Sequence, residues 1–194
     1  MSEGQERSPQ ERNPFEITRH EVLYEGRVFT VIRDEVRHES GYEAVREVVV
    51  HDGGAVVVAV DADDRVLLVR QFRYPLATHI LELPAGKLSP DEDPLDCAQR
   101  ELREETGVTA RRWETLTAML STPGFCTEEL FIYLALELED GEQALEEGEE
   151  SIEVQRLPLH EAIALCANGS IRDGKTVTGL FLAALRLGLI SHVP

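Results

Sequence analysis

The chain has 194 residues, and its 37 acidic and 19 basic side chains give it a formal net charge of −18. That length suits one sizeable domain with a real core, and a hydrophobic share of 42% is an ordinary globular balance. The strong negative charge argues against nucleic acid or an anionic membrane surface as the main partner. A bound cation is one way in which such a chain could hold a small anionic ligand.

Cysteine usage and the absence of long apolar runs predict a cytoplasmic protein. Cys97, Cys126 and Cys166 form no Cys-x-x-Cys pair, which favours reduced thiols over a disulfide framework or a zinc site. No apolar run approaches the roughly 18–20 residues that a membrane span needs. The polar N-terminal segment of mixed charge is unlike a signal peptide.

The predicted elements begin after residues 1–13, a polar tail that we expect to be disordered. Residues 14–50 hold three short runs of β-branched and aromatic residues between turn signals, which predict a small antiparallel β element. Residues 51–194 form the main domain, with strands predicted at 54–60, 65–72, 79–83, 113–120 and 130–138 and helices at 94–106, 158–167 and 175–189. Mixed strands with three helices predict a layered α/β (α+β) domain.

Residues 137–153 hold nine acidic side chains and no basic one, which predicts a solvated, partly disordered loop. The sequence leaves open whether a carboxylate within this segment, such as Glu149 or Glu150, has a function.

The helix at 94–106 places two carboxylates side by side. Asp93 suits the N-cap, Pro94 the first helical position, and Gly107 the position just past the end. At about 100° per residue, Glu101 and Glu105 stand together beside the apolar stripe. Two adjacent carboxylates favour a hard divalent cation such as Mg²⁺ or Mn²⁺, although an acidic solvent-facing helix side would show the same pattern.

Two neighbouring features add to this candidate metal site. Arg100 stands one turn before Glu104 and is expected to hold it. Gly86 permits a sharp turn that could aim the Ala85 carbonyl at the same cation.

Residues 86–108 read GKLSPDEDPLDCAQRELREETGV and fill every fixed position of the Nudix box. The sequence therefore resembles the Nudix hydrolases, which cleave nucleoside diphosphates linked to another group. The resemblance implies an α/β/α sandwich with a mixed sheet, and water attack on a diphosphate. It implies metal ligation by the Ala85 carbonyl, Glu101 and Glu105, with Glu104 as a supporting contact oriented by Arg100.

Further stretches resemble the ADP-ribose pyrophosphatase branch of that superfamily. They are VRQFRYP at 69–75, LELPAGKL at 81–88, STPGFCTEE at 121–129 with Pro123, and IRDGKTVTGLFLA at 171–183. The branch implies Mg²⁺-dependent hydrolysis of ADP-ribose, or a related ADP-sugar, to AMP and ribose 5-phosphate. It also implies a homodimer to which residues 14–50 contribute.

The same resemblance assigns roles outside the box. Glu128 corresponds to a catalytic glutamate on a mobile loop, with Glu129 as a competing assignment. Arg73 matches a position that contacts substrate phosphate or ribose. The remaining positions are substrate contacts at Arg46, Glu47 and Glu82, and an aromatic side chain stacked on adenine, for which Phe29 and Tyr42 are candidates.

Three other interpretations compete with this one. A Nudix pyrophosphatase could act on a GDP-sugar, NADH, FAD or an oxidised nucleotide. A non-catalytic Nudix-like sensor would be expected to lack box glutamates, which this chain retains. Residues 169–176, GSIRDGKT, match the phosphate-binding P-loop pattern, but a helix rather than a buried strand is predicted before them. We instead expect Asp173 or Gly174 to start the last helix.

Overall fold

The computed structural model describes residues 12–145 and 152–190. The chain divides into two compact units, Met1–His51 with Gly124–Cys126, and Asp52–Pro123 with Thr127–Pro194. Most of the predicted tail lies outside the described residues, as do Glu149 and Glu150. In the described part of the chain, no helix is both long and apolar enough to cross a membrane.

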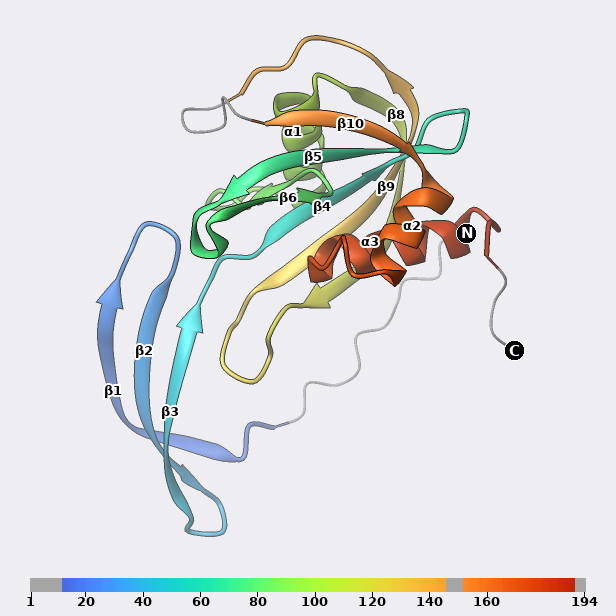
Figure 1. The fold of residues 1–194 in the computed structure, drawn as a ribbon. Coiled ribbons are helices and arrows are strands. Elements are labelled where there is room, and N and C mark those ends of the chain that lie inside the picture. The colour runs from blue at the N-terminus through green and yellow to red at the C-terminus, as the bar shows by residue number, and fades with distance from the viewer. Residues whose placement is uncertain (1–11, 146–151, 191–194) are drawn as a thin grey trace, which may run out of the picture. The chain divides into compact units, whose positions relative to one another are not determined.

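The first unit is a three-stranded antiparallel sheet in the order β1-β2-β3 (Figure 1). Its strands are β1 (Phe15–Glu25), β2 (Thr30–His38) and β3 (Glu43–Val50), which confirms the predicted antiparallel β element. The sheet buries little of itself: every residue of β1 after Phe15 is exposed. Asp34 is one of its few buried side chains and lies 2.6 Å from Nδ1 of His20.

The second unit contains two sheets. The four-stranded sheet has the order β7-β4-β9-β8, with β4 and β9 parallel and the outer pairs antiparallel. Its strands are β4 (Gly54–Ala59), β7 (Ala85–Lys87), β8 (Thr109–Leu120) and β9 (Glu129–Glu139). The antiparallel sheet β10-β5-β6 consists of β5 (Arg65–Arg73), β6 (Thr78–Glu82) and β10 (Glu153–Pro158), and the 3-10 turn η1 (Tyr74–Leu76) follows β5.

Strand β4 explains the layers of this unit, because every one of its residues is buried. Ala55 and Val57 face one core, which they share with Ala98 and Leu102 of α1 (Pro94–Thr106). The alternate residues Val56 and Val58 face a second core, together with residues of α2 (Leu159–Ala167) and α3 (Gly174–Arg186). A strand covered on both faces reads as a continuous apolar run, and the result is the expected α/β/α sandwich.

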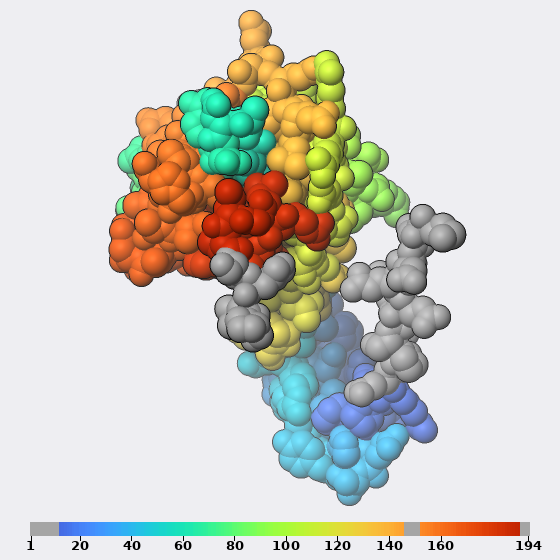
Figure 2. Space-filling view, turned by 90° about the vertical axis from the view of Figure 1, so that its right-hand side faces the viewer, coloured from blue at the N-terminus to red at the C-terminus, as the bar shows by residue number. Residues whose placement is uncertain are grey.

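The C-terminal helices pack against the four-stranded sheet. Figure 2 shows them in orange and red beside β8 in yellow-green. Arg186, in the last turn of α3, donates to Glu114 of β8 at 2.8 Å and ties the two elements together.

The last helix, α3, ends at Arg186 and not at residue 189, and two strands also differ from the sequence-based expectations. Strand β10 was not predicted, because its sequence EVQRLP has no regular alternation and is paired only through β5, far away in the chain. The turn expected at Ala85–Gly86 is instead a short edge strand, β7, paired with β4.

Candidate active site

Helix α1 is fixed at both ends by its own sequence. The Asp93 carboxylate accepts the N–H of Leu95 at 2.8 Å, and Pro94 occupies the first turn. Gly107 ends the helix in the left-handed conformation (φ 73°), and its N–H donates to the Arg103 carbonyl at 2.8 Å. The ends agree with the prediction, and they set the helix register that orients the glutamates.

Two carboxylates of α1 are buried against the edge strand β7. Glu101 and Glu105 are 7% and 2% exposed. The Glu105 carboxylate accepts the N–H of Ala85 at 3.0 Å. Glu101 lies against Gly86, where a Cβ atom would come within 1.7 Å of Glu101 Oε1. The fold therefore brings Ala85, Glu101 and Glu105 to one place.

Arg100 joins three glutamates with its guanidinium group. It donates to Glu92 at 2.9 and 3.1 Å, to Glu104 at 3.1 Å and to Glu101 at 2.6 Å. Its hydrogen bonds are the main reason that the pKa of Glu92 falls from 4.5 to about 2. The contact with Glu104 was expected, whereas the contact with Glu101 was not.

The donor set suits a hard divalent cation. Glu101, Glu105 and the Ala85 carbonyl offer only oxygen atoms, the ligands that Mg²⁺ and Mn²⁺ prefer. Glycine at position 86 leaves room beside the Glu101 carboxylate that any side chain would fill. Within residues 12–145 and 152–190, no three His, Cys, Asp or Glu side chains group as a metal cluster would.

A second charged group lies immediately before this site in the chain. Arg73, the last residue of β5, donates twice to the Glu82 carboxylate, at 2.6 and 3.0 Å. Burial alone would lower the pKa of Arg73, but the bonds to Glu82 and the charges of Glu105 and Asp173 raise it. Glu82 is 1% exposed. Besides any contact with a ligand, its buried carboxylate therefore holds the Arg73 side chain in place.

Lys175 and Asp173, which the sequence-based site omitted, belong to this second group. Lys175 donates to both Glu82 and Asp173. Asp173 caps α3 by accepting the N–H of Thr176, as expected for the start of the last helix. Although burial raises the pKa of Asp173, Lys175 and Thr176 outweigh it and lower that pKa. The only sequence feature that singled out Asp173 and Lys175 was the segment GSIRDGKT, and it gives no indication of a contact with Glu82.

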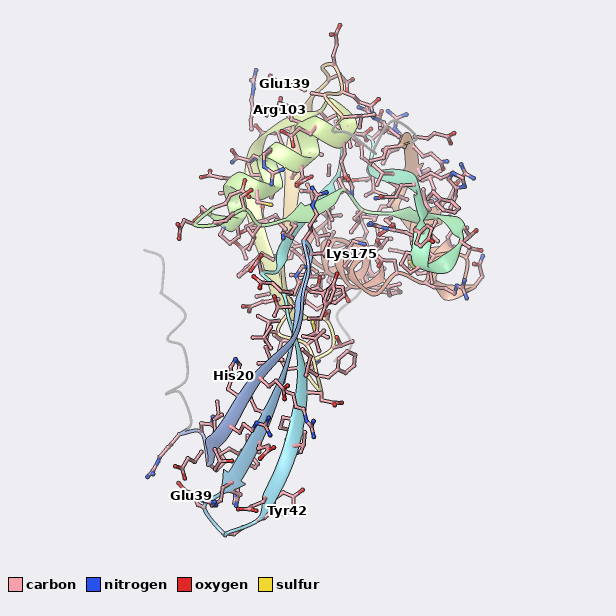
Figure 3. All side chains as sticks on the ribbon, turned by 90° about the vertical axis from the view of Figure 1, so that its left-hand side faces the viewer. His20, Glu39, Tyr42, Arg103, Glu139 and Lys175 are labelled. Atoms are coloured by element: carbon pink, nitrogen blue, oxygen red, sulfur yellow. The ribbon has the colours of Figure 1, made fainter. Side chains whose placement is uncertain are left out.

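The remaining predicted site residues lie on other elements of the chain. Glu128 is half-buried just before β9, whereas Glu129 is exposed at its first position. Arg46 and Glu47 are exposed on β3 of the first unit, where the Arg46 guanidinium lies 5.4 Å from the centre of the Phe15 ring. The aromatic candidates Phe29 and Tyr42 are exposed in the same unit; Figure 3 labels Tyr42 near the β2–β3 turn.

The described part of the acidic segment is more ordered than the predicted loop. Strand β9 runs through residue 139, and the chain then packs on the C-terminal end of α1. The N–H of Ala144 donates to the Glu104 carbonyl at 3.1 Å, and the Gln143 side chain donates to the Glu105 carbonyl. These bonds satisfy carbonyl groups that a helix end leaves without intrahelical partners.

Comparison with known proteins identifies the family of this chain. The model of the NUDIX domain matches residues 50–179. The chain belongs to the Nudix hydrolase family. It is similar to the ADP-ribose pyrophosphatase of Bacillus subtilis (strain 168), with 36% identity over 87% of this chain and 92% of that protein. These findings make it an enzyme of the Nudix pyrophosphatase type.

Other Nudix relatives carry different names. A methanol dehydrogenase activator of Bacillus methanolicus is 38% identical over 81% of this chain and 85% of that protein. A GDP-mannose pyrophosphatase of Yersinia pestis (strain Pestoides F) is 35% identical over 78% and 81%. A crystal structure of an ADP compounds hydrolase, 24% identical, superposes with a TM-score of 0.80 over 95% of this chain and all of that one, which confirms the Nudix fold.

Proposed function

We propose that this Nudix enzyme hydrolyses ADP-ribose, or a related ADP-sugar, to AMP and ribose 5-phosphate with the help of Mg²⁺. The observation that carries the proposal is the pair of buried carboxylates, Glu101 and Glu105, held one helical turn apart against Gly86 and Ala85 respectively. The similarity to an ADP-ribose pyrophosphatase over most of both chains supports the choice of substrate.

The Ala85 carbonyl, Glu101 and Glu105 would hold the divalent cation. When bound there, such a cation neutralises diphosphate charge and lowers the pKa of a coordinated water. Arg100 keeps Glu104 and Glu101 in place through its hydrogen bonds.

Two residues outside the box complete the proposed chemistry. Glu128 accepts the proton of the attacking water as the P–O bond to the bridging oxygen breaks. Arg73 binds the diphosphate or the ribose, because its guanidinium group is held by Glu82 while its side chain is still 39% exposed. In the first unit, Arg46 and Glu47 add substrate contacts, and an exposed aromatic side chain stacks on the adenine.

A GDP-sugar is the second candidate substrate. Proteins named GDP-mannose pyrophosphatase are about as similar to this chain as those named for ADP-ribose, with identities of 35% and 36%. The groups around α1 would contact the diphosphate and not the base, so they suit either nucleotide.

A substrate panel tests the proposal. Purified protein with Mg²⁺ is incubated with ADP-ribose, ADP-glucose, GDP-mannose, NADH and FAD, and the products are separated by chromatography. We expect AMP and ribose 5-phosphate from ADP-ribose, at a kcat/KM at least tenfold above that for GDP-mannose. Intact ADP-ribose after long incubation would refute the proposal, and faster cleavage of GDP-mannose would select the second candidate.

We further propose that the protein is a cytoplasmic homodimer in which the first unit lies at the interface. This three-stranded sheet leaves large apolar side chains in water, with Ile17, Tyr24 and Tyr42 each more than half exposed. A small sheet of this kind needs cover to be stable. Sedimentation should give twice the chain mass of 21.7 kDa. A fully active monomer would contradict the proposal.

A further inference from the structure

Lys175, which Figure 3 labels, lies in the first turn of α3. Its ammonium group donates to Glu82, the last residue of β6. Its ammonium group also donates to Asp173 at 2.9 Å, and its side chain is only 12% exposed. Lys175 is therefore almost fully enclosed between two carboxylates. Neither the proposed function nor the family resemblance assigns it a role.

Glu82 is shared between two cations. Arg73 binds it through Nε and Nη2, and Lys175 binds it through Nζ. Because Glu82 is 1% exposed, water contributes little to its stabilisation, and the two cations must do so. Together with Asp173, the group holds two positive and two negative charges and is neutral as a whole.

Thr176 anchors this group of four charged side chains through hydrogen bonds to Asp173 and Leu83. Asp173 accepts the Thr176 hydroxyl at 2.6 Å and its N–H at 3.0 Å. The Thr176 hydroxyl oxygen in turn accepts the N–H of Leu83 at 2.9 Å. The start of α3 is thus bonded to the residue that follows Glu82, so Lys175 approaches Glu82 from a fixed position.

We propose that Lys175 is a positioning residue for substrate binding, which fixes Arg73 through Glu82 and keeps the group around Arg73 electrically neutral. The inference rests on the proposed function, in which Arg73 contacts the diphosphate. Without Lys175, two carboxylates share the one remaining guanidinium group. The local charge becomes −1, which opposes an anionic ligand, and Glu82 is free to shift and carry Arg73 with it.

The effect should fall on binding more than on chemistry, because the hydrogen bonds of Lys175 join it to Glu82 and Asp173 and not to the proposed metal ligands or Glu128. We expect Lys175→Met to raise the KM for ADP-ribose about tenfold with kcat within twofold of wild type. Lys175→Gln, which keeps a polar side chain there, should do the same, and Lys175→Arg should restore most of the affinity because it restores the charge.

Arg186→Met is the matched control. It removes a positive charge and an ion pair from the same helix, but at its exposed far end, where Arg186 bonds Glu114. Its KM should match that of wild type. Calorimetric titration with inorganic pyrophosphate in the presence of Mg²⁺ gives a second readout that needs no cleavage of ADP-ribose, and its Kd should rise about tenfold in Lys175→Met.

The results separate this inference from the proposed function. A fall in melting temperature for Lys175→Met and Lys175→Gln, with KM and pyrophosphate Kd unchanged, would show a structural role only and overturn the inference. Failure of wild type to bind pyrophosphate would also overturn it. If wild type cleaves GDP-mannose and not ADP-ribose, the proposed substrate fails, while the same change in KM measured with GDP-mannose still supports Lys175 as a positioning residue.

Discussion

Gly86 and Glu101 are so close that a Cβ atom at position 86 would lie 1.7 Å from Glu101 Oε1. The contact sets an upper limit on the size of residue 86 and explains why glycine stands at the centre of β7. A larger residue must displace the carboxylate, since the helix that carries Glu101 is packed in the core through Cys97, Ala98 and Leu102.

Gly86→Ala is therefore expected to damage activity more than folding. Displacing a ligand carboxylate by about 1 Å costs on the order of a hundredfold in rate, so kcat/KM for ADP-ribose should fall at least that much. Circular dichroism should still show the native helices and strands. Wild-type kinetics in Gly86→Ala would contradict the proposed place of Glu101 in the site.

Gly107 is expected to matter for stability, because its surroundings leave no room. It has φ +73°, and a Cβ there would lie 2.7 Å from the Glu142 carbonyl carbon. Gly169 offers a matched control, with φ +79° and nothing within 4 Å. Gly169→Ala should lose about 1 kcal/mol of unfolding free energy from backbone strain alone. Gly107→Ala should lose about 2 kcal/mol more from the clash, or from detachment of residues 141–144.

Urea denaturation of the two variants checks this difference. Equal losses for Gly107→Ala and Gly169→Ala would mean that the chain after β9 does not pack on α1 in solution. Exchange of the Ala144 amide hydrogen should also be faster in Gly107→Ala than in wild type, because its bond to the Glu104 carbonyl depends on that packing.

The pairing of Glu92 with Arg100 predicts a pH-dependent contribution to stability. Mainly because Arg100 bonds its charged form, the pKa of Glu92 falls from 4.5 to about 2 in the folded protein. A depressed carboxyl pKa stabilises the fold fully above the unfolded value of 4.5, and this contribution is lost as the pH falls through the folded value.

Glu92→Gln removes that titration. At pH 7 the variant should be less stable than wild type by about 3 kcal/mol at most, and the difference should shrink by about 2 kcal/mol between pH 6 and pH 3. Urea denaturation at several pH values measures it. A difference that stays constant over this range would show that the ion pair does not depress the pKa of Glu92.

The parts of the fold that the sequence predicts are those encoded locally. Asp93 and Gly107 mark the ends of α1 because caps depend on a few neighbouring residues. The run at 54–60 predicts β4 because burial on both faces requires apolar residues throughout. The Nudix box then locates Glu101 and Glu105, since its residues are contiguous in the chain and run from β7 through a short connection into α1 and just past its end.

What the sequence does not predict depends on contacts between distant segments. Glu82 and Lys175 are 93 residues apart, and no spacing rule connects a strand end with a helix start at that distance. The bond between Arg100 and Glu101 was missed for a different reason. Adjacent residues on a helix point in different directions. The arginine side chain is nevertheless long enough for its guanidinium group to contact the carboxylate of the next residue.

The segment from the end of β8 to the start of β9 offers two glutamates as the proton acceptor, Glu128 and Glu129. Glu128 is half-buried, and its backbone carbonyl accepts the N–H of Ser121 at 3.3 Å, whereas Glu129 is exposed and begins β9. A base must be held near its proton, which favours the half-buried residue. Glu128→Gln should lower kcat for ADP-ribose by a factor of about 10² to 10⁴ with KM little changed.

Glu129→Gln is the comparison variant, with the same chemical change one position along the chain, and we expect its kcat to stay within twofold of wild type. The kcat of Glu128→Gln should also depend less on pH on the acidic side than that of wild type, because the group that must lose its proton is gone. The reverse outcome, a large loss only in Glu129→Gln, would move the base to Glu129. Loss in neither variant would place the proton acceptor outside this segment.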